Sequence, residues 1–151
     1  ILVASTPFFA EQADWPGIKP DVLNAFKEQL VTHREKTIER FLAIQAMGSN
    51  SARDDIKKLK QLLNEFPAPR DAALTAGLDI LQQDDLRDLF KDISVPLKGV
   101  FGRLDALVPY RVISKIKALN DDFEYEVLDK ASHAPFISHK DEFLSAIKSM
   151  L

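Results

Sequence analysis

This chain contains two kinds of hydrophobic pattern, one typical of strands and one typical of helices. Short apolar runs at residues 1–5, 95–101 and 123–128 are bounded by proline, glycine or charged residues, which is the pattern of buried β-strands. Between the first two runs, apolar residues instead recur at helical spacing. The clearest helical stripe consists of Ile56, Leu59, Leu62, Leu63 and Phe66.

Helix start signals refine this pattern. Pro20 can open a first helix that runs to about Leu30. The Ser/Thr-x-x-acid spacing of helix N-termini occurs three times, at Thr32 and Glu35, at Ser51 and Asp54, and at Ser138 and Asp141. Further helices are expected over 71–81, over 85–91 and from 109 to 119.

The order of elements predicts an α/β fold with three parallel strands. Residues 1–5 form a core strand, 6–92 a loop and helical cap that returns to the core, and 93–151 a strand–helix–strand–helix core. Three strands are too few for a covered parallel sheet. Because the chain begins without Met inside an apolar run, we expect a cut end. A missing N-terminal segment or another chain would then cover the strand at 1–5.

Two candidate catalytic side chains follow the second and third strands. Asp105 and His133 lie 28 residues apart, which suits one helix and one strand between them. Since parallel strands end at the same edge of a sheet, both side chains are expected at that edge. Carboxylate before imidazole is the order of the last two members of the Ser, Asp, His triad on an α/β-hydrolase sheet. There, the imidazole moves a proton while the carboxylate orients it.

The first member of such a triad is absent from the sequence. No serine stands in G-x-S-x-G, and Ser5, Ser49 and Ser51 lack the strand–turn–helix context of a nucleophile elbow. We therefore expect the nucleophile and the oxyanion donors outside these 151 residues, and the chain alone to be inactive. Taken singly, Asp105 could be a turn cap and His133 a polar contact.

Composition and charge exclude several other chemistries. The absence of Cys rules out disulfides and a Cys nucleophile, and three scattered His residues argue against a zinc cage, so neither metal nor cofactor is expected. No run is long enough to span a bilayer and no signal peptide is visible, which favours a cytoplasmic protein. Residues 33–61 carry a net +3 and the rest −6, giving the overall −3. This pattern indicates a local acidic partner rather than nucleic acid.

The chain also resembles a known enzyme family. The resemblance is carried by Trp15–Leu23, Glu39–Gly48, Leu104–Pro109 and His133–His139. These segments are similar to α/β-hydrolases, and more narrowly to the bacterial carboxylesterases that hydrolyse the methyl ester of pimeloyl-acyl-carrier protein in biotin synthesis. The similarity covers nearly the whole chain and corresponds to the C-terminal portion of the family enzyme.

The resemblance implies roles for particular residues. Asp105 and His133 would be the triad acid and base, and the helices over 20–81 would be the cap. The pocket for the acyl chain would be lined by Phe41, Leu42, Ala43, Ile44 and Gln45. The acidic acyl-carrier protein would meet Lys36, Arg40, Arg53 and Lys57.

Two other readings remain open from the residues themselves. The basic pairs are spaced i, i+4 and share a helical face, but such a face can simply be solvated. The segment 41–45 can equally be core packing. The chain could therefore be a non-catalytic helical module that binds an acidic partner, or an α/β-hydrolase of another kind, such as a carbon–carbon bond hydrolase or a dehalogenase.

Overall fold

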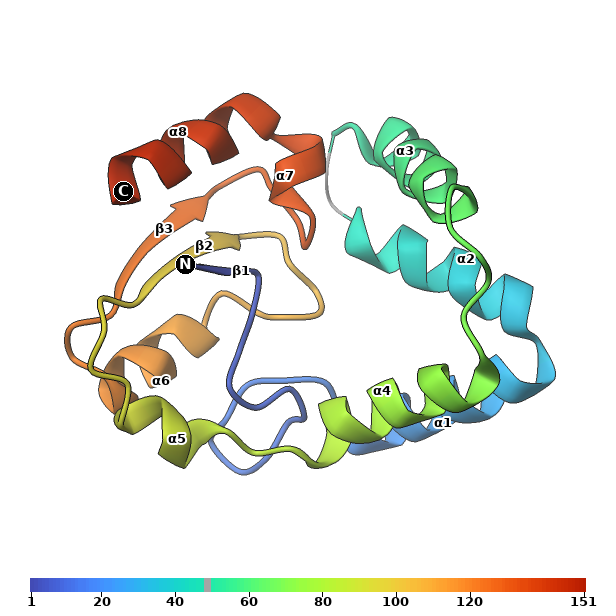
Figure 1. Cartoon of the computed structure of the whole chain (residues 1–151), viewed down its shortest axis with the longest axis horizontal. Helices are drawn as coiled ribbons and strands as arrows, with labels where there is room; N and C mark the ends of the chain where they lie inside the picture. Colours follow the sequence, from blue (N-terminus) through green and yellow to red (C-terminus); the bar gives the residue numbers. More distant parts are fainter. Residues whose placement is uncertain (48–49) are drawn as a thin grey trace.

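The computed structural model describes residues 1–47 and 50–151. The described elements run, in chain order, β1 (Leu2–Val3), α1 (Pro20–Thr32), α2 (Arg34–Gln45), α3 (Ala52–Asn64), α4 (Asp71–Gln83), α5 (Arg87–Lys91), β2 (Lys98–Gly102), α6 (Val112–Leu119), β3 (Glu124–Leu128), α7 (Pro135–Ser138) and α8 (Lys140–Met150) (Figure 1). In this part of the chain, no helix is both long and apolar enough to cross a membrane.

The three strands form one parallel sheet, as the sequence predicts, and their order in the sheet is β1-β2-β3. Gly99 pairs with Leu2 on one side and with Tyr125 on the other. Two strands are shorter than expected. β1 ends where Ala4 takes a φ of 44°, and β2 begins only after Pro96, which has no N–H to give to a ladder.

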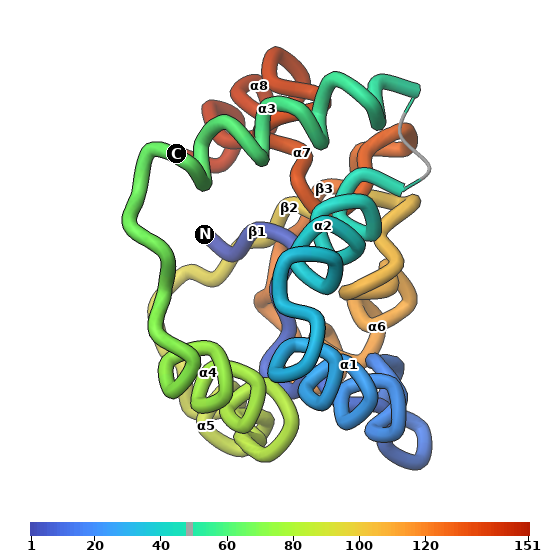
Figure 2. The backbone as a smooth tube through the Cα atoms, turned by 90° about the vertical axis from the view of Figure 1, so that its right-hand side faces the viewer, coloured from blue at the N-terminus to red at the C-terminus, as the bar shows by residue number. Residues whose placement is uncertain are grey.

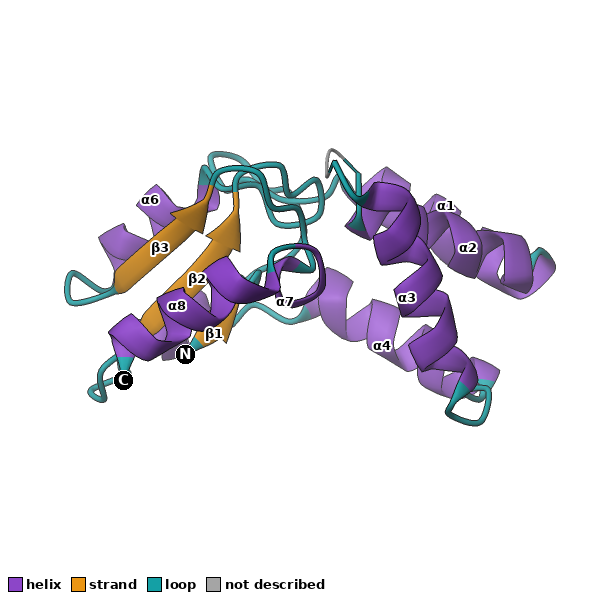
Figure 3. Cartoon of the chain, turned by 90° about the horizontal axis from the view of Figure 1, so that it is seen from above, coloured by secondary structure: helices purple, strands orange, loops and turns teal. Residues whose placement is uncertain are grey.

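Each face of the sheet is covered by a helix of the C-terminal region. Helices α6 and α8 lie on opposite faces (Figures 1 and 3). On the α6 side, Phe101 and Phe123 are fully buried against Ile116 and the loop residue Trp15. On the α8 side, a smaller cluster joins Val100, Leu128, Ala131 and Ala146. Strand β2 is largely buried, whereas the first three residues of β3 are exposed although its sequence pattern predicts a buried strand. The packing of α6 and α8 still fixes both strands in position, and with them the loops that follow.

Helices α1 to α4, which we call the cap, lie beside the sheet as a separate layer (Figures 1 and 2). Helix α1 packs against α2 and α4, and α2 packs against α3. Phe26 and Phe41 join α1 to α2 with ring centroids 5.6 Å apart. Helix α4 has no buried residue, and its ties to α1 and α2 include ion pairs of Asp79 with Lys27 and of Asp71 with Arg34.

The expected helix caps are corrected by the structure. Thr32 is the last residue of α1, and its hydroxyl donates to the carbonyl of Glu28 instead of opening α2. Ser138 ends the short helix α7, so α8 begins at Lys140. Ser51 stands at the N-cap of α3 as expected, but its hydroxyl donates to Asp55 Oδ2 at 2.8 Å. Local hydroxyl–carbonyl bonds compete with capping for the same side chains. Ser49 lies outside the described residues.

Gly102 allows the loops after β2 and β3 to approach each other. A Cβ at this position would lie 2.2 Å from the carbonyl oxygen of Ser132 and 2.5 Å from that of Ala131. Backbone atoms cannot yield as a flexible side chain can, so only glycine fits without moving one of the loops.

We expect Gly102→Ala to lower the free energy of unfolding by about 2–3 kcal/mol, because the added methyl group overpacks a rigid backbone contact. Urea denaturation measures the change. Gly77→Ala is the matched control, since Gly77 lies inside α4 with nothing within 4 Å of its Cβ position. That control should gain about 0.5–1 kcal/mol from helix propensity. Equal stability of the two variants would contradict the proposed clash.

Candidate active site

Asp105 and His133 meet at the carboxyl edge of the sheet. The distance between Asp105 Oδ2 and His133 Nδ1 is 2.9 Å. Asp105 lies in the loop after β2 and His133 in the loop after β3, which is the juxtaposition that the parallel topology predicts. The pair is a charge-assisted hydrogen bond across two loops that are distant in sequence.

The carboxylate is held by the backbone of its own loop. Asp105 Oδ1 accepts hydrogen bonds from the N–H groups of Leu107 at 2.8 Å and Val108 at 2.9 Å. The Asp105 side chain has no exposed surface. With Oδ1 occupied by two amides, Oδ2 is aimed at the imidazole. A buried carboxylate with three donors is well compensated and rigidly oriented.

Two contacts position His133, one to its ring from Asp105 and one to its backbone from Gln45. Its side chain is 24% exposed, in contrast to its fully buried partner. A carboxylate acceptor at Nδ1 requires the proton on that nitrogen, which leaves Nε2 as the basic nitrogen. The backbone N–H of His133 donates to the carbonyl of Gln45 at 3.2 Å. The last residue of α2 in the cap therefore contacts the loop that carries the imidazole.

Further contacts hold the two loops together. The N–H of Leu104 donates to the carbonyl of Ala131 at 3.0 Å, and Ser132 Oγ donates back to the Leu104 carbonyl at 3.4 Å. At the surface, Arg103 pairs with Asp129 at 2.6 Å, and this hydrogen bond raises the pKa of the Arg103 guanidinium above its ordinary value. The separation of acid and base is thus fixed at several points.

The other two imidazoles have different surroundings. His33 Nδ1 lies 3.0 Å from Thr32 Oγ1, and His139 Nδ1 lies 2.8 Å from Ser138 Oγ. Of the three imidazoles, only that of His133 lies within hydrogen-bond distance of a carboxylate in the part of the chain that the structure describes. Within residues 1–47 and 50–151, no group of three His, Asp or Glu side chains is placed to hold a metal ion.

The segment expected to line an acyl pocket forms the last turn and a half of α2. Leu42 is buried, Ala43 is exposed, and the other three residues are half-buried. Phe41 packs on Phe26, whereas Gln45 is the residue whose carbonyl contacts the His133 loop. The end of this segment therefore lies next to the imidazole loop, and its beginning packs inside the cap.

The four basic residues expected to meet a carrier protein are all exposed. Lys36 and Arg40 border a surface depression of about 500 Å³ between α1 and α2, while Arg53 and Lys57 lie on the neighbouring helix α3. An ion pair of 2.6 Å between Glu39 and Lys60 joins α2 to α3. This contact lowers the pKa of the Glu39 carboxyl. The two basic pairs thus lie on adjacent helices that are linked to each other.

Some positioning groups escape sequence reasoning because they act through the backbone. The amides of Leu107 and Val108 and the carbonyl of Gln45 leave no mark in residue type. An Asp in a strand-to-helix loop can accept hydrogen bonds from the backbone amides two and three residues later, as in an Asx-type turn. This is the one signal in the sequence that could have indicated the amide contacts. Gly102 at a strand end could likewise have indicated close backbone approach.

Solved structures with a similar fold define the class of protein. An esterase from Exiguobacterium antarcticum superposes with a TM-score of 0.79 at 20% identity, over 95% of this chain and 53% of that one. A bromoperoxidase from Bacillus anthracis gives a TM-score of 0.74 at 18% identity, over 98% and 55% of the two chains. The three parallel strands with their helices and cap are part of an α/β-hydrolase fold.

Curated relatives define the family more narrowly. Pimeloyl-[acyl-carrier protein] methyl ester esterases are 52% identical in Shewanella sp. (strain MR-7) and 43% identical in Serratia marcescens, each over 100% of this chain. The relative from Pseudoalteromonas atlantica is 49% identical over 95% of this chain. The chain matches members of this esterase family over 95–100% of its own length, and it spans 56–59% of the length of these relatives. No family model matches the chain.

We expect Asp105→Ala to lower the free energy of unfolding by about 3 kcal/mol, because it leaves two buried amides without an acceptor and frees the His133 ring. Urea denaturation measures the loss. Asp129→Ala removes an exposed carboxylate of the same pair of loops and should change stability by less than about 1 kcal/mol. Asp105→Asn, which keeps an acceptor for the amides, should fall between the two. Similar losses for Asp105→Ala and Asp129→Ala would contradict this assignment.

Proposed function

We propose that the protein acts as a carboxylesterase on the methyl ester of a pimeloyl group carried by acyl-carrier protein. The proposal is supported by the 2.9 Å contact between the buried Asp105 carboxylate and His133, together with the substrate named for its relatives. Asp105 and His133 supply the acid and base of the triad. The serine and the oxyanion donors come from a segment outside residues 1–151, since no G-x-S-x-G motif occurs here.

The proposed reaction follows from the geometry of the pair. His133 Nε2 takes the proton of the serine hydroxyl as its oxygen attacks the ester carbonyl, and then gives that proton to the departing methoxide, which leaves as methanol. Water next attacks the acyl-enzyme in the same way and releases the carboxylate. Asp105 stays ionised throughout and stabilises the imidazolium that forms in each step.

In this proposal the cap binds the two ends of the substrate. Residues 41–45 line the acyl chain, and Gln45 is in place to do so because its backbone already contacts the His133 loop. Lys36, Arg40, Arg53 and Lys57 attract the acidic carrier protein. Charge of one sign on adjacent helices raises the rate of encounter with an oppositely charged partner.

The proposal also includes a further segment or chain that covers β1. Ile1 is half exposed, and β1 pairs on one side only with another described strand. The cap likewise exposes large apolar side chains, namely Leu62, Leu63 and Phe66. Large apolar side chains that are exposed close together at and just after the end of one helix, as these three are, are compatible with a contact with more protein. We place the division between cap and core at 6–92 and 93–151, and the enzyme in the cytoplasm, where its carrier-linked substrate would be found.

In the protein that includes the nucleophile segment, His133→Ala should lower kcat for a p-nitrophenyl ester by about 10⁴-fold, because the general base is lost. Asp105→Asn should give a loss of similar order, and His139→Ala should leave kcat within about twofold. A fluorophosphonate probe should label the added segment only. Residues 1–151 alone should show no turnover. Activity of that chain that disappears in His133→Ala would overturn the proposal, and activity retained by His133→Ala in the complete protein would overturn His133 as the base. Salt-sensitive binding of the carrier protein without any ester hydrolysis would favour the non-catalytic module.

Replacement of both Lys36 and Arg40 by Glu should raise KM for a carrier-linked ester by about tenfold and leave kcat unchanged. Electrostatic attraction affects the association of the carrier protein with the enzyme and not the chemical step. KM for a free p-nitrophenyl ester should not change. Lys148→Glu, on α8 away from the cap, provides the control. Added salt should weaken binding of the carrier-linked ester to the unmodified protein. Equal KM values for the double variant and Lys148→Glu would refute the assignment of these two residues.

A further inference from the structure

The outer edge of β3 offers unused backbone hydrogen-bonding groups. In the described part of the sheet, β3 pairs with β2 only. The N–H of Glu124 donates to the carbonyl of Leu97, and the N–H of Arg103 donates to that of Leu128. Alternate residues of a strand bond to the same side, so Glu124, Glu126 and Leu128 bond toward β2. The N–H and C=O groups of Tyr125 and Val127 therefore point away from the sheet.

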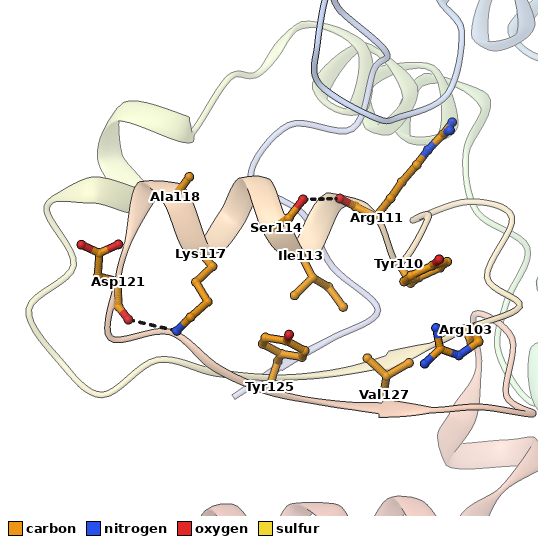
Figure 4. Close-up of a pocket in the computed structure, with 10 residues that line it drawn as sticks. All are labelled: Arg103, Tyr110, Arg111, Ile113, Ser114, Lys117, Ala118, Asp121, Tyr125 and Val127. Carbon is orange, nitrogen blue, oxygen red and sulfur yellow. Dashed lines mark hydrogen bonds between the residues drawn. The ribbon is translucent and has the colours of Figure 1, made fainter.

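A groove of about 720 Å³ runs beside this free edge (Figure 4). Tyr125 and Val127 lie beneath α6, opposite Ile113 (Figure 4). Tyr110 closes one end, and the Tyr110 and Tyr125 side chains are 46% and 47% exposed. An edge strand with accessible aromatic side chains on one face provides both the backbone groups and the side-chain contacts that an added strand requires.

The groove is lined by more cations than anions, namely Arg103, Arg111 and Lys117 against the single carboxylate of Asp121. Lys117 lies beside Tyr125, where its ammonium donates to the carbonyls of Asp121 and Phe123 at 3.1 and 3.2 Å. At the other end, the Arg103 guanidinium lies 4.9 Å from the centre of the Tyr110 ring and also pairs with Asp129 at 2.6 Å. Arg111 stands at the rim. On the opposite face of the strand, Glu124 and Glu126 are exposed, and Glu124 also pairs with Lys98 at 3.2 Å. The two faces of the edge thus present opposite charges.

From this arrangement we infer that the β3 edge binds an extended peptide segment of a partner protein by strand addition. Side chains of the added strand that face α6 are acidic at the ends and aliphatic in the middle, to meet Lys117, Tyr125 and Arg103. The alternate side chains are basic, to meet Glu124 and Glu126. Backbone bonds to Tyr125 and Val127 supply affinity, and the alternation of charge supplies specificity.

A second copy of this chain does not fit the same edge. Antiparallel pairing of two β3 strands would place Glu124 and Glu126 of one copy beside the same acidic pair of the other. Like charges directly opposite each other destabilise paired strands. Charged residues on an edge are a recognised means by which proteins prevent edge-to-edge association.

The palindromic peptide Ac-Lys-Glu-Lys-Val-Lys-Glu-Lys-NH₂ tests the proposal, because its pattern is the same in either strand direction. Fluorescence anisotropy of the labelled peptide should show saturable binding to the protein. The charge-exchanged peptide Ac-Glu-Lys-Glu-Val-Glu-Lys-Glu-NH₂ should bind at least about tenfold more weakly. In a bound strand, either the amides of Val and Glu or those of the Lys residues face β3. N-methylation of the set that faces β3 should abolish binding, and N-methylation of the other set should not.

Variants of the protein complete the test. Lys117→Glu should weaken binding of the first peptide by about tenfold, whereas Lys58→Glu, on α3 in the cap, should leave it unchanged. Because the peptide controls leave the protein intact, they decide the outcome even if a variant misfolds. Equal affinity for the two peptides, or binding that survives both N-methylated sets, would overturn the proposal. Self-association at the β3 edge, detected by sedimentation velocity and removed by Lys117→Glu, would overturn it in favour of a second copy.

Discussion

The buried Asp105 carboxylate is the group around which the candidate site is arranged. It receives two backbone amides on one oxygen and an imidazole on the other, at 2.8, 2.9 and 2.9 Å. An ionised carboxylate without exposed surface is stable only if donors of this kind replace its water. The loop after β2 and the loop after β3 must therefore keep their spacing. The glycine at position 102 and the backbone bonds between residues 103–104 and 128–131 maintain that spacing.

The core elements were predictable because their signals are strong and local. The apolar runs at 95–101 and 123–128 identify β2 and β3, and a single intervening helix makes them parallel. That topology places Asp105 and His133 at the same edge of the sheet, and the contacts of their own loops bring them to 2.9 Å. Strand ends were less predictable, since Pro96 and the positive φ of Ala4 act at single residues. Helix starts were predicted least well, because Thr32 and Ser138 bond to carbonyls of the preceding turn.

The arrangement of the cap helices could not be predicted from hydrophobic periodicity alone. Spacing indicates that Lys36 and Arg40 share a face, and also Arg53 and Lys57, but it does not show that α2 and α3 are neighbours joined by Glu39 and Lys60. Nor could it place the end of α2 against the imidazole loop. Contacts between elements distant in sequence depend on packing, and here the resemblance to a family gave information that the local pattern did not contain. The roles given to residues 41–45 remain predictions.

The contact between the cap and the His133 loop is made by a main-chain carbonyl, that of Gln45. Substitution at position 45 changes the side chain but leaves this acceptor in place. The residue can therefore vary in size and polarity without releasing the loop that presents the imidazole. Within one scaffold, the surface at the end of α2 can therefore change in shape while the Asp105–His133 pair keeps its geometry.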